Sequence, residues 1–157
     1  MSSNARSPVA FGAYIITRRI ARGGMAEIYR ARTRGGPSED PKWVAIKMMR
    51  SSLGHEELRS RLFQREAKIA RRLNHPNVIP VFEFGTEMDR PYLAMEYLRG
   101  RDLSHLAKSE KNDGVPYGLC LFIGQMAAAG LGHAHRATDD DGRSLGIVHR
   151  DISPGNV

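Results

Sequence analysis

The sequence is poor in cysteine, in aromatic residues and in long apolar runs. Cys120 is the single cysteine of the 157 residues, so no internal disulfide can form, and its apolar neighbours predict a buried thiol that packs as a small hydrophobic group. No stretch approaches the roughly 20 apolar residues that a membrane helix needs. The start, MSSNARSPVAFG, lacks the apolar segment of a secretory signal. These absences argue against a disulfide scaffold and a membrane segment in this chain, and they predict a cytoplasmic protein.

Positive charge is concentrated in the first half of the chain. Residues 1–72 carry 16 Lys and Arg against 6 Asp and Glu, a net charge of +10, whereas residues 73–157 carry 8 against 11, a net charge of −3. A basic segment suits nucleic-acid binding, but it also suits a cleft that attracts phosphate groups. The arginines are dispersed and aromatic residues make up only 7%, so we expect no nucleic-acid partner. A DNA binder with steep salt dependence remains the alternative interpretation.

The order of strand and helix patterns predicts an α+β fold. A hydrophobic content of 41% and a charged content of 26% are typical of folded globular chains. Short β-rich runs separated by turn residues predict a three-strand meander and then a hairpin, and apolar residues at helical spacing predict three helices. The expected strands are 14–20, 27–34, 43–49, 78–84 and 91–97, with a further strand at 147–148; the expected helices are 56–73, 102–111 and 117–136. Residues 119–131 are apolar on most faces, which predicts deep burial.

A carboxylate interrupts the apolar stripe of the first expected helix. Glu66 falls in register with the stripe, so it needs a cationic partner or a place at the rim of a polar cleft. Lys47 is the best candidate, because strand alternation places it on one face with Ala45. The alternative is that both side chains point into solvent. The stripe consists of Leu58, Leu62, Ile69 and Leu73.

Two loops have patterns that suit phosphate chemistry. The small residues between Ile20 and Ile28 let backbone N–H groups approach a phosphate chain, although a glycine pair between strands is often only a hairpin turn. In the segment 149–156, HRDISPGN, Asp151 and Asn156 lie five residues apart. That spacing can place a carboxylate near a reacting hydroxyl and an amide oxygen near a metal ion. The alternative is that the triplet His149-Arg150-Asp151 is part of a solvated loop.

Together these motifs resemble the protein kinase family, in its bacterial serine/threonine branch. The resemblance implies a five-stranded antiparallel N-lobe sheet with one helix, followed by the first helices of a mainly helical C-lobe. It implies a flexible N-terminus over 1–13, an ATP-binding N-lobe over 14–98, and the start of a C-lobe over 99–157. It also implies phosphoryl transfer from ATP, with Mg2+, to a serine or threonine hydroxyl of a protein substrate.

The same resemblance implies roles for individual residues. Lys47 would hold the α- and β-phosphates and pair with Glu66, Asp151 would orient the hydroxyl and accept its proton, and Asn156 would ligate a magnesium ion. Asp102 would contact the ribose or, equally, cap the following helix. The remaining ATP contacts implied are Ile20, Ala21, Arg22, Gly23, Gly24, Met25, Ala26, Ile28, Ala45, Met95, Glu96 and Leu98.

The sequence departs from the family pattern in three places. Ala21 and Ala26 replace two loop glycines, and Ser153 replaces the usual lysine of the catalytic loop. The third departure is that residues 1–157 contain no Asp-Phe-Gly magnesium ligand. We therefore expect the chain alone to be inactive as an enzyme. The alternative function is a catalytically silent nucleotide-binding or interaction module, with a completing chain as one partner.

Overall fold

The computed structural model describes residues 7–35, 40–50, 56–109 and 115–157. It divides the chain into two compact units. The first comprises Met1–Arg71 and Pro80–Leu98, and the second comprises Arg72–Ile79 and Arg99–Val157. Among the helices in these described ranges, none is long and apolar enough to cross a membrane.

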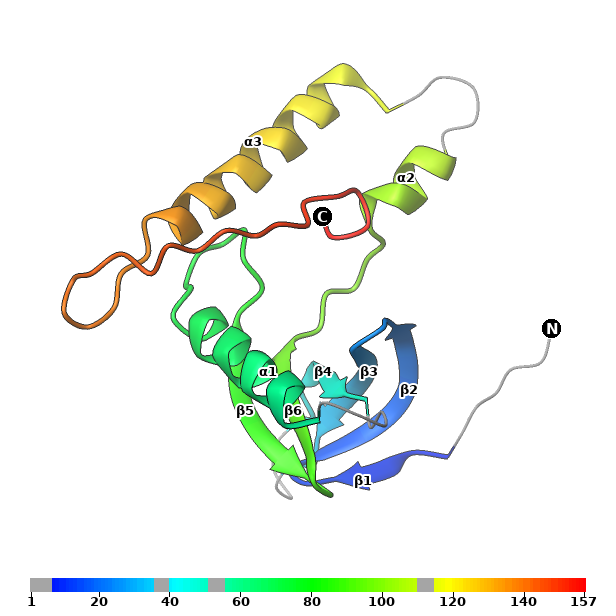
Figure 1. The fold of residues 1–157 in the computed structure, drawn as a ribbon. Helices are drawn as coiled ribbons and strands as arrows, with labels where there is room; N and C mark the ends of the chain where they lie inside the picture. The colour runs from blue at the N-terminus through cyan, green and yellow to red at the C-terminus, as the bar shows by residue number, and fades with distance from the viewer. Residues whose placement is uncertain (1–6, 36–39, 51–55, 110–114) are drawn as a thin grey trace. The chain divides into compact units, whose positions relative to one another are not determined.

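The first unit is built on an antiparallel sheet of six strands (Figure 1). The strand order is β1-β2-β3-β4-β6-β5. The bounds are β1 Val9–Phe11, β2 Tyr14–Arg22, β3 Ala26–Thr33, β4 Trp43–Met49, β5 Val81–Glu87 and β6 Arg90–Glu96. Strand β4 has the bounds expected from sequence, whereas β5 begins three residues later than the expected strand 78–84.

The sixth strand, β1, is the difference from the expected five. It lies within the first 13 residues, which sequence analysis assigned to a flexible terminus, and it pairs with the beginning of β2. Gly12 makes the tight turn between them, with a φ of 49° that glycine adopts without steric cost. Three residues are too few for an alternating pattern to stand out in the sequence.

One face of this sheet encloses an apolar core because the sheet is strongly curled. The core includes Phe11, Ile46 and Tyr92, all buried. The hydroxyl of Tyr14, on β2, donates to Glu83 Oε2, on β5, at 2.5 Å, and the hydroxyl of Tyr92 donates to Glu83 Oε1 at 2.7 Å. Since β2 and β5 are far apart in the strand order, the bond from Tyr14 closes the curled sheet, whereas the bond from Tyr92 joins the neighbouring strands β6 and β5. Burial, and then the bond to Glu83, raises the pKa of Tyr92 to about 12.

The other face of the sheet packs against α1, Glu56–Ala70, through a helix face that sequence analysis did not predict. Phe63 is 5% exposed and Ala67 is fully buried, and they pack in a cluster with Leu93 of β6. The expected stripe is wrong at its start, because Leu58 and Leu62 are 59% and 49% exposed. Phe63 buries a large aromatic ring, and Ala67, one turn later, is small enough for the helix to approach the sheet closely. The true face is therefore rotated by one residue.

The second unit contains α2, Leu103–Ser109, and α3, Tyr117–His135. The end of α3 packs closely on the segment after α1: a Cβ built on Gly130 would lie 2.9 Å from the carbonyl oxygen of Asn77. Asn77 Nδ2 also donates to the carbonyl of Met126 at 2.9 Å. Glycine at position 130 permits this approach of helix to backbone.

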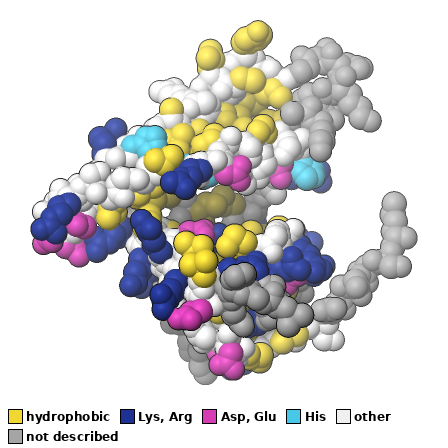
Figure 2. Space-filling model, in the orientation of Figure 1, with side chains coloured by type: hydrophobic (Ala, Val, Ile, Leu, Met, Phe, Trp, Pro, Cys, Tyr) yellow, Lys and Arg dark blue, Asp and Glu magenta, His cyan; other side chains and the backbone are white. Residues whose placement is uncertain are grey.

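The first half of α3 is exposed, contrary to the deep burial expected from its composition. Tyr117, Leu121 and Phe122 are among its exposed apolar side chains, and hydrophobic groups gather along the helix in Figure 2. Cys120 is also exposed rather than buried. Residues 147–148 form no strand, because no described strand pairs with them. Apolar composition indicates that a segment tends to be buried. Whether it is buried depends on other parts of the structure that pack against it.

Candidate functional site

Strand β4 and helix α1 of the first unit bring Lys47 and Glu66 together. Lys47 lies on β4 between Ile28 of β3 and Leu93 of β6, and its Nζ donates to Glu66 Oε1 of α1. The side chains are 27% exposed for Lys47 and 57% for Glu66. The ion pair inferred from sequence is thus present, but Glu66 lies on the exposed flank of the helix rather than on its buried face. An exposed carboxylate retains water contacts, so the pair carries little desolvation cost.

An aromatic ring supports the lysine of this pair. Lys47 Nζ lies 5.9 Å from the ring centroid of Phe63, the residue that anchors α1 to the sheet. An ammonium over an aromatic face is attracted by the ring quadrupole. Helix α1 therefore positions the ammonium group of Lys47 through both the carboxylate of Glu66 and the ring of Phe63.

Apolar residues expected to contact adenine lie beside Lys47 on the same unit. Ala45 is buried on β4 and pairs across the sheet with Met95 of β6. The N–H of Glu96 donates to the carbonyl of Pro80 at 3.1 Å, so this N–H is already engaged. Leu98, two residues further on, is exposed and accessible to a ligand.

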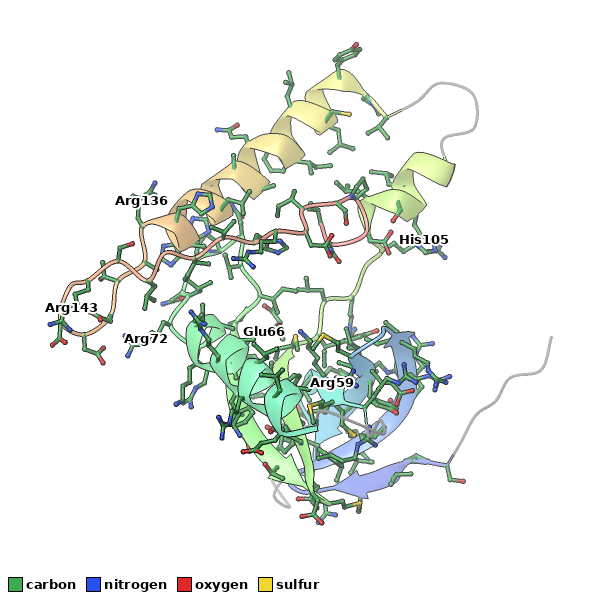
Figure 3. The ribbon with its side chains drawn as sticks, in the orientation of Figure 1. Arg59, Glu66, Arg72, His105, Arg136 and Arg143 are labelled. Atoms are coloured by element: carbon green, nitrogen blue, oxygen red, sulfur yellow. The ribbon has the colours of Figure 1, made fainter. Side chains whose placement is uncertain are left out.

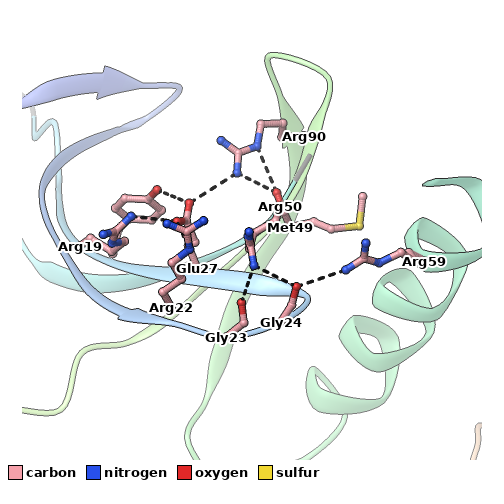
Figure 4. Close-up of polar contacts among 10 residues, drawn as sticks. Arg19, Arg22, Gly23, Gly24, Glu27, Met49, Arg50, Arg59 and Arg90 are labelled. Carbon is pink, nitrogen blue, oxygen red and sulfur yellow. Dashed lines mark hydrogen bonds and ion pairs between the residues drawn. The ribbon is translucent and has the colours of Figure 1, made fainter. Parts of the chain in front are cut away.

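The glycine-containing loop between β2 and β3 is a tight hairpin, held by arginines that sequence analysis did not select. The N–H of Gly23 donates to the carbonyl of Ala26 at 2.9 Å. Arg50, just after β4, and Arg59, on α1, donate side-chain hydrogen bonds to loop carbonyls (Figure 4). The expected contacts Ile20, Ala21, Arg22, Met25 and Ala26 lie on the loop and its two flanking strands.

Glu27, at the base of this loop, is a second feature that sequence analysis missed. It accepts hydrogen bonds from Tyr29 at 2.7 Å and from Arg19 at 3.0 Å, and Arg22 lies at 3.6 Å. The bond from Tyr29, followed by the bond and charge of Arg19, holds the pKa of Glu27 below its ordinary value. Arg90 reaches the same carboxylate at 4.0 Å and also donates to the carbonyl of Met49. These contacts fix the base of the hairpin to the neighbouring strands.

In the second unit, the segment 149–157 closes on itself through Asp151 and Asn156. Asn156 Nδ2 donates to the backbone carbonyl of Asp151 and to its Oδ2, both at 2.9 Å. Arg150, between His149 and Asp151, has a φ of 65°, which turns the chain sharply at that point. The five-residue spacing noted in the sequence therefore creates a loop in which a carboxylate and an amide are adjacent.

The start of α2 supports this loop. The first backbone N–H groups of the helix have no partner within the helix itself. Here the N–H of Leu103 donates to the carbonyl of Val157, and the N–H of Ser104 donates to the carbonyl of Pro154, both at 3.0 Å. The loop thus satisfies two helix donors and is held in place by them.

The oxygen atoms of Asp151 and Asn156 suit a hard cation such as Mg2+, which prefers carboxylate and carbonyl ligands. Because Asn156 points its amide nitrogen at Asp151, its oxygen is directed elsewhere. Within the described ranges, no group of three or more His, Cys, Asp or Glu side chains could hold a metal ion.

Asp102 caps α2, which agrees with the helix-cap alternative. Its Oδ1 accepts bonds from Ser104 Oγ at 2.7 Å and from the N–H of His105 at 3.0 Å, and His105 Nδ1 lies at 3.2 Å. These bonds, that of Ser104 first, lower the pKa of Asp102 to about 2. The carboxylate is therefore already occupied by its own helix.

The hydrogen bonds that Asp102 accepts as the cap of α2 predict that its carboxyl group is unusually acidic. We expect Asp102 to titrate near pH 2 in the folded chain, and the midpoint to rise toward the ordinary 3.8 in Ser104→Ala. Because folding lowers this pKa, the stability that the cap contributes is present above about pH 4 and is lost as the pH falls toward 2. A carboxyl-carbon NMR titration measures both midpoints. An unchanged midpoint in Ser104→Ala would contradict the assigned cause.

Comparison with known proteins gives one family across nearly the whole chain. A family model described as "Protein kinase domain" matches residues 14–157. The tyrosine-protein kinase MasK of Myxococcus xanthus is 38% identical over 149 residues, which cover 94% of this chain and 23% of that protein. The serine/threonine-protein kinase PknD of Chlamydia caviae is 37% identical over 148 residues, covering 92% of this chain and 15% of that protein.

Solved structures give the same result. The crystal structure of the M. tuberculosis PknI kinase domain superposes with a TM-score of 0.74 and 29% identity, over 96% of this chain and 55% of that one. The chain thus spans about half of that solved domain and less than a quarter of each of the two relatives described above.

Proposed function

Since this chain belongs to the protein kinase family, we propose that it binds ATP together with Mg2+ and contributes to phosphoryl transfer onto a hydroxyl of a protein substrate. The observation that carries this proposal is the ion pair between Lys47 and Glu66 beside a loop whose backbone carbonyls are all engaged. A lysine held by a carboxylate at a fixed place on a sheet presents a localised positive charge to phosphate oxygens. The loop adds backbone N–H donors to the same anionic group.

The chain's residues divide into binding and reaction roles in this proposal. Ala45 and Met95 form part of an apolar surface for adenine, and the backbone of Glu96 and Leu98 bonds the base. Lys47 holds the α- and β-phosphates. Because the N–H of Glu96 already donates to Pro80, its carbonyl is the group left to accept from the base.

The second unit supplies the groups that act on the hydroxyl. Asp151 orients the substrate hydroxyl and accepts its proton, since a carboxylate within hydrogen-bonding distance can serve as a general base. Asn156, bonded to Asp151, keeps that carboxylate in place and offers its amide oxygen to Mg2+. When bound, Mg2+ neutralises the charge that phosphate oxygens carry. Asp102 contacts the ribose only by giving up part of its role as a helix cap.

The proposed acceptor is serine or threonine. Pro154, one residue after Ser153, favours such acceptors within the family, and the similar proteins include both a serine/threonine kinase and a tyrosine kinase by name. Ser153 in place of lysine removes one positive charge from the loop, so the loop neutralises less of the phosphate charge.

Equilibrium binding of nucleotides to the chain tests the proposal. Calorimetric titration with ATP and with AMP, each in the presence of Mg2+, should show saturable binding of both with ATP the tighter ligand. The reason is that AMP carries only the α-phosphate, whereas ATP adds the β- and γ-phosphates, which give Lys47 and the loop N–H groups more charge to contact. Absence of ATP binding, or equal affinity for the two nucleotides, would overturn the proposed function.

A further inference from the structure

Every backbone carbonyl at the tip of the glycine-containing loop accepts a hydrogen bond from the protein. Those of Gly23 and Gly24 receive Arg50 Nη1, at 3.1 and 3.3 Å, and Gly24 also receives Arg59 Nη2 at 3.4 Å. The carbonyl of Met25 accepts from the backbone N–H of Arg50 at 3.0 Å, and that of Ala26 accepts from Gly23. Two arginines thus supply most of the donors that hold four consecutive carbonyls.

This arrangement also orients the donors of the loop. In a trans peptide the carbonyl of one residue and the N–H of the next point in opposite directions. Carbonyls of Gly23 and Gly24 that face the arginines therefore turn the N–H groups of Gly24 and Met25 away from them. Within the part of the chain that the structure describes, no hydrogen bond engages these two N–H groups. They remain available to an anion such as a phosphate.

Helix α1 connects this loop to the lysine. Arg59 and Glu66 lie seven residues apart on α1, about two helical turns, so they project from nearly the same side of the helix (Figure 3). Arg59 bonds the loop at Gly24, and Glu66 bonds Lys47. A displacement of α1 therefore loosens two contacts at once.

We propose that Arg50 and Arg59 are positioning residues that hold the phosphate-binding loop in shape, and that α1 couples the order of this loop to the Lys47–Glu66 pair. The inference rests on the proposed function for its ligand, a nucleotide phosphate, but not for its geometry. The two arginines compensate for Ala21 and Ala26: the loop lacks two glycines of its family, and external donors fix the conformation that it adopts.

Amide hydrogen exchange without nucleotide tests the geometry directly. The reporters are the N–H groups of Gly23 and Arg50, which bond the loop carbonyls of Ala26 and Met25. Exchange at both, followed by NMR, is expected to accelerate about fivefold in Arg59→Ala and more in Arg50→Ala, because a charged donor is lost. Arg59→Lys, which can still donate one bond, should restore part of the protection.

A matched control is Arg61→Ala on the same helix, since Arg61 pairs with Glu57 and not with the loop. It should leave exchange at Gly23 and Arg50 unchanged. Equal exchange in wild type and both arginine variants, or equal acceleration by Arg61→Ala, would overturn the inference. The coupling predicts in addition that Glu66→Gln accelerates exchange in the wild-type background but adds little in Arg59→Ala.

Nucleotide titration separates this inference from the proposed function. Arg59→Ala should weaken ATP binding severalfold and leave AMP binding nearly unchanged, because AMP lacks the phosphates that reach the loop. If wild type binds no ATP, the proposed function fails while the exchange result still decides the geometry. If ATP binds equally to wild type and Arg59→Ala despite faster exchange, the positioning role is overturned.

Discussion

Replacing Phe63 with alanine is expected to lower the free energy of unfolding of the chain by about 3 kcal/mol, which is the lower end of the range for a buried phenylalanine. Phe63 is 5% exposed, packs with Ala67 and Leu93, and lies 6.3 Å from the ring of Phe84. Its removal leaves a cavity between α1 and the sheet. Denaturant unfolding followed by circular dichroism gives the change in free energy.

The neighbouring Leu62→Ala is the matched control. Leu62 precedes Phe63 on α1 but is 49% exposed, so its truncation is expected to cost less than about 1 kcal/mol. The pair of variants distinguishes two helix faces one residue apart. A larger loss for Leu62→Ala than for Phe63→Ala would show that the helix packs on the face predicted from the sequence pattern.

Replacing Lys47 with methionine is expected to weaken ATP binding at least about tenfold, equivalent to about 1.4 kcal/mol. Methionine keeps a side chain of similar length but removes the charge that the proposed function assigns to the phosphates. The fold should change little, because Glu66 is 57% exposed and water can solvate its carboxylate when the lysine is lost. Calorimetric titration with ATP measures the affinity, and a thermal melt checks the fold.

Lys68→Met provides the control for this substitution. Lys68 lies in the last turn of α1 and is exposed. The substitution removes the same charge from the same unit as Lys47→Met does. Its ATP affinity should equal that of wild type. If both variants weaken binding equally, the effect reflects the net charge of the unit, and Lys47 has no specific role.

The sequence was sufficient to predict features that depend on local patterns. Strand β4 has the predicted bounds because Val44 and Ile46 alternate with residues of the opposite face. The spacing of Asp151 and Asn156 identified the loop that contains both residues, although the hydrogen bond between them was not predicted. The contact of Lys47 with Glu66 was inferred because Glu66 falls in register with the expected apolar stripe of its helix, although that stripe is not the buried face.

Other features depend on the surroundings of a segment and could not be predicted from its own pattern. The face of α1 was assigned one residue away, because leucines at helical spacing outnumber the single phenylalanine that packs against the sheet. Arg50 and Arg59 donate to backbone carbonyls of the loop. Because every residue type has a backbone carbonyl, no sequence pattern identifies such a contact. The seven-residue interval between Arg59 and Glu66 indicates only that the two side chains project from the same side of a helix.

The two outer strands of the sheet are unfavourable templates for aggregation. Strand β1 has three residues, and the ladder of β5 with β6 is irregular between Val81 and Glu83. A short or kinked edge offers few consecutive peptide groups to a foreign chain. Fibril growth by strand addition is therefore disfavoured for this unit.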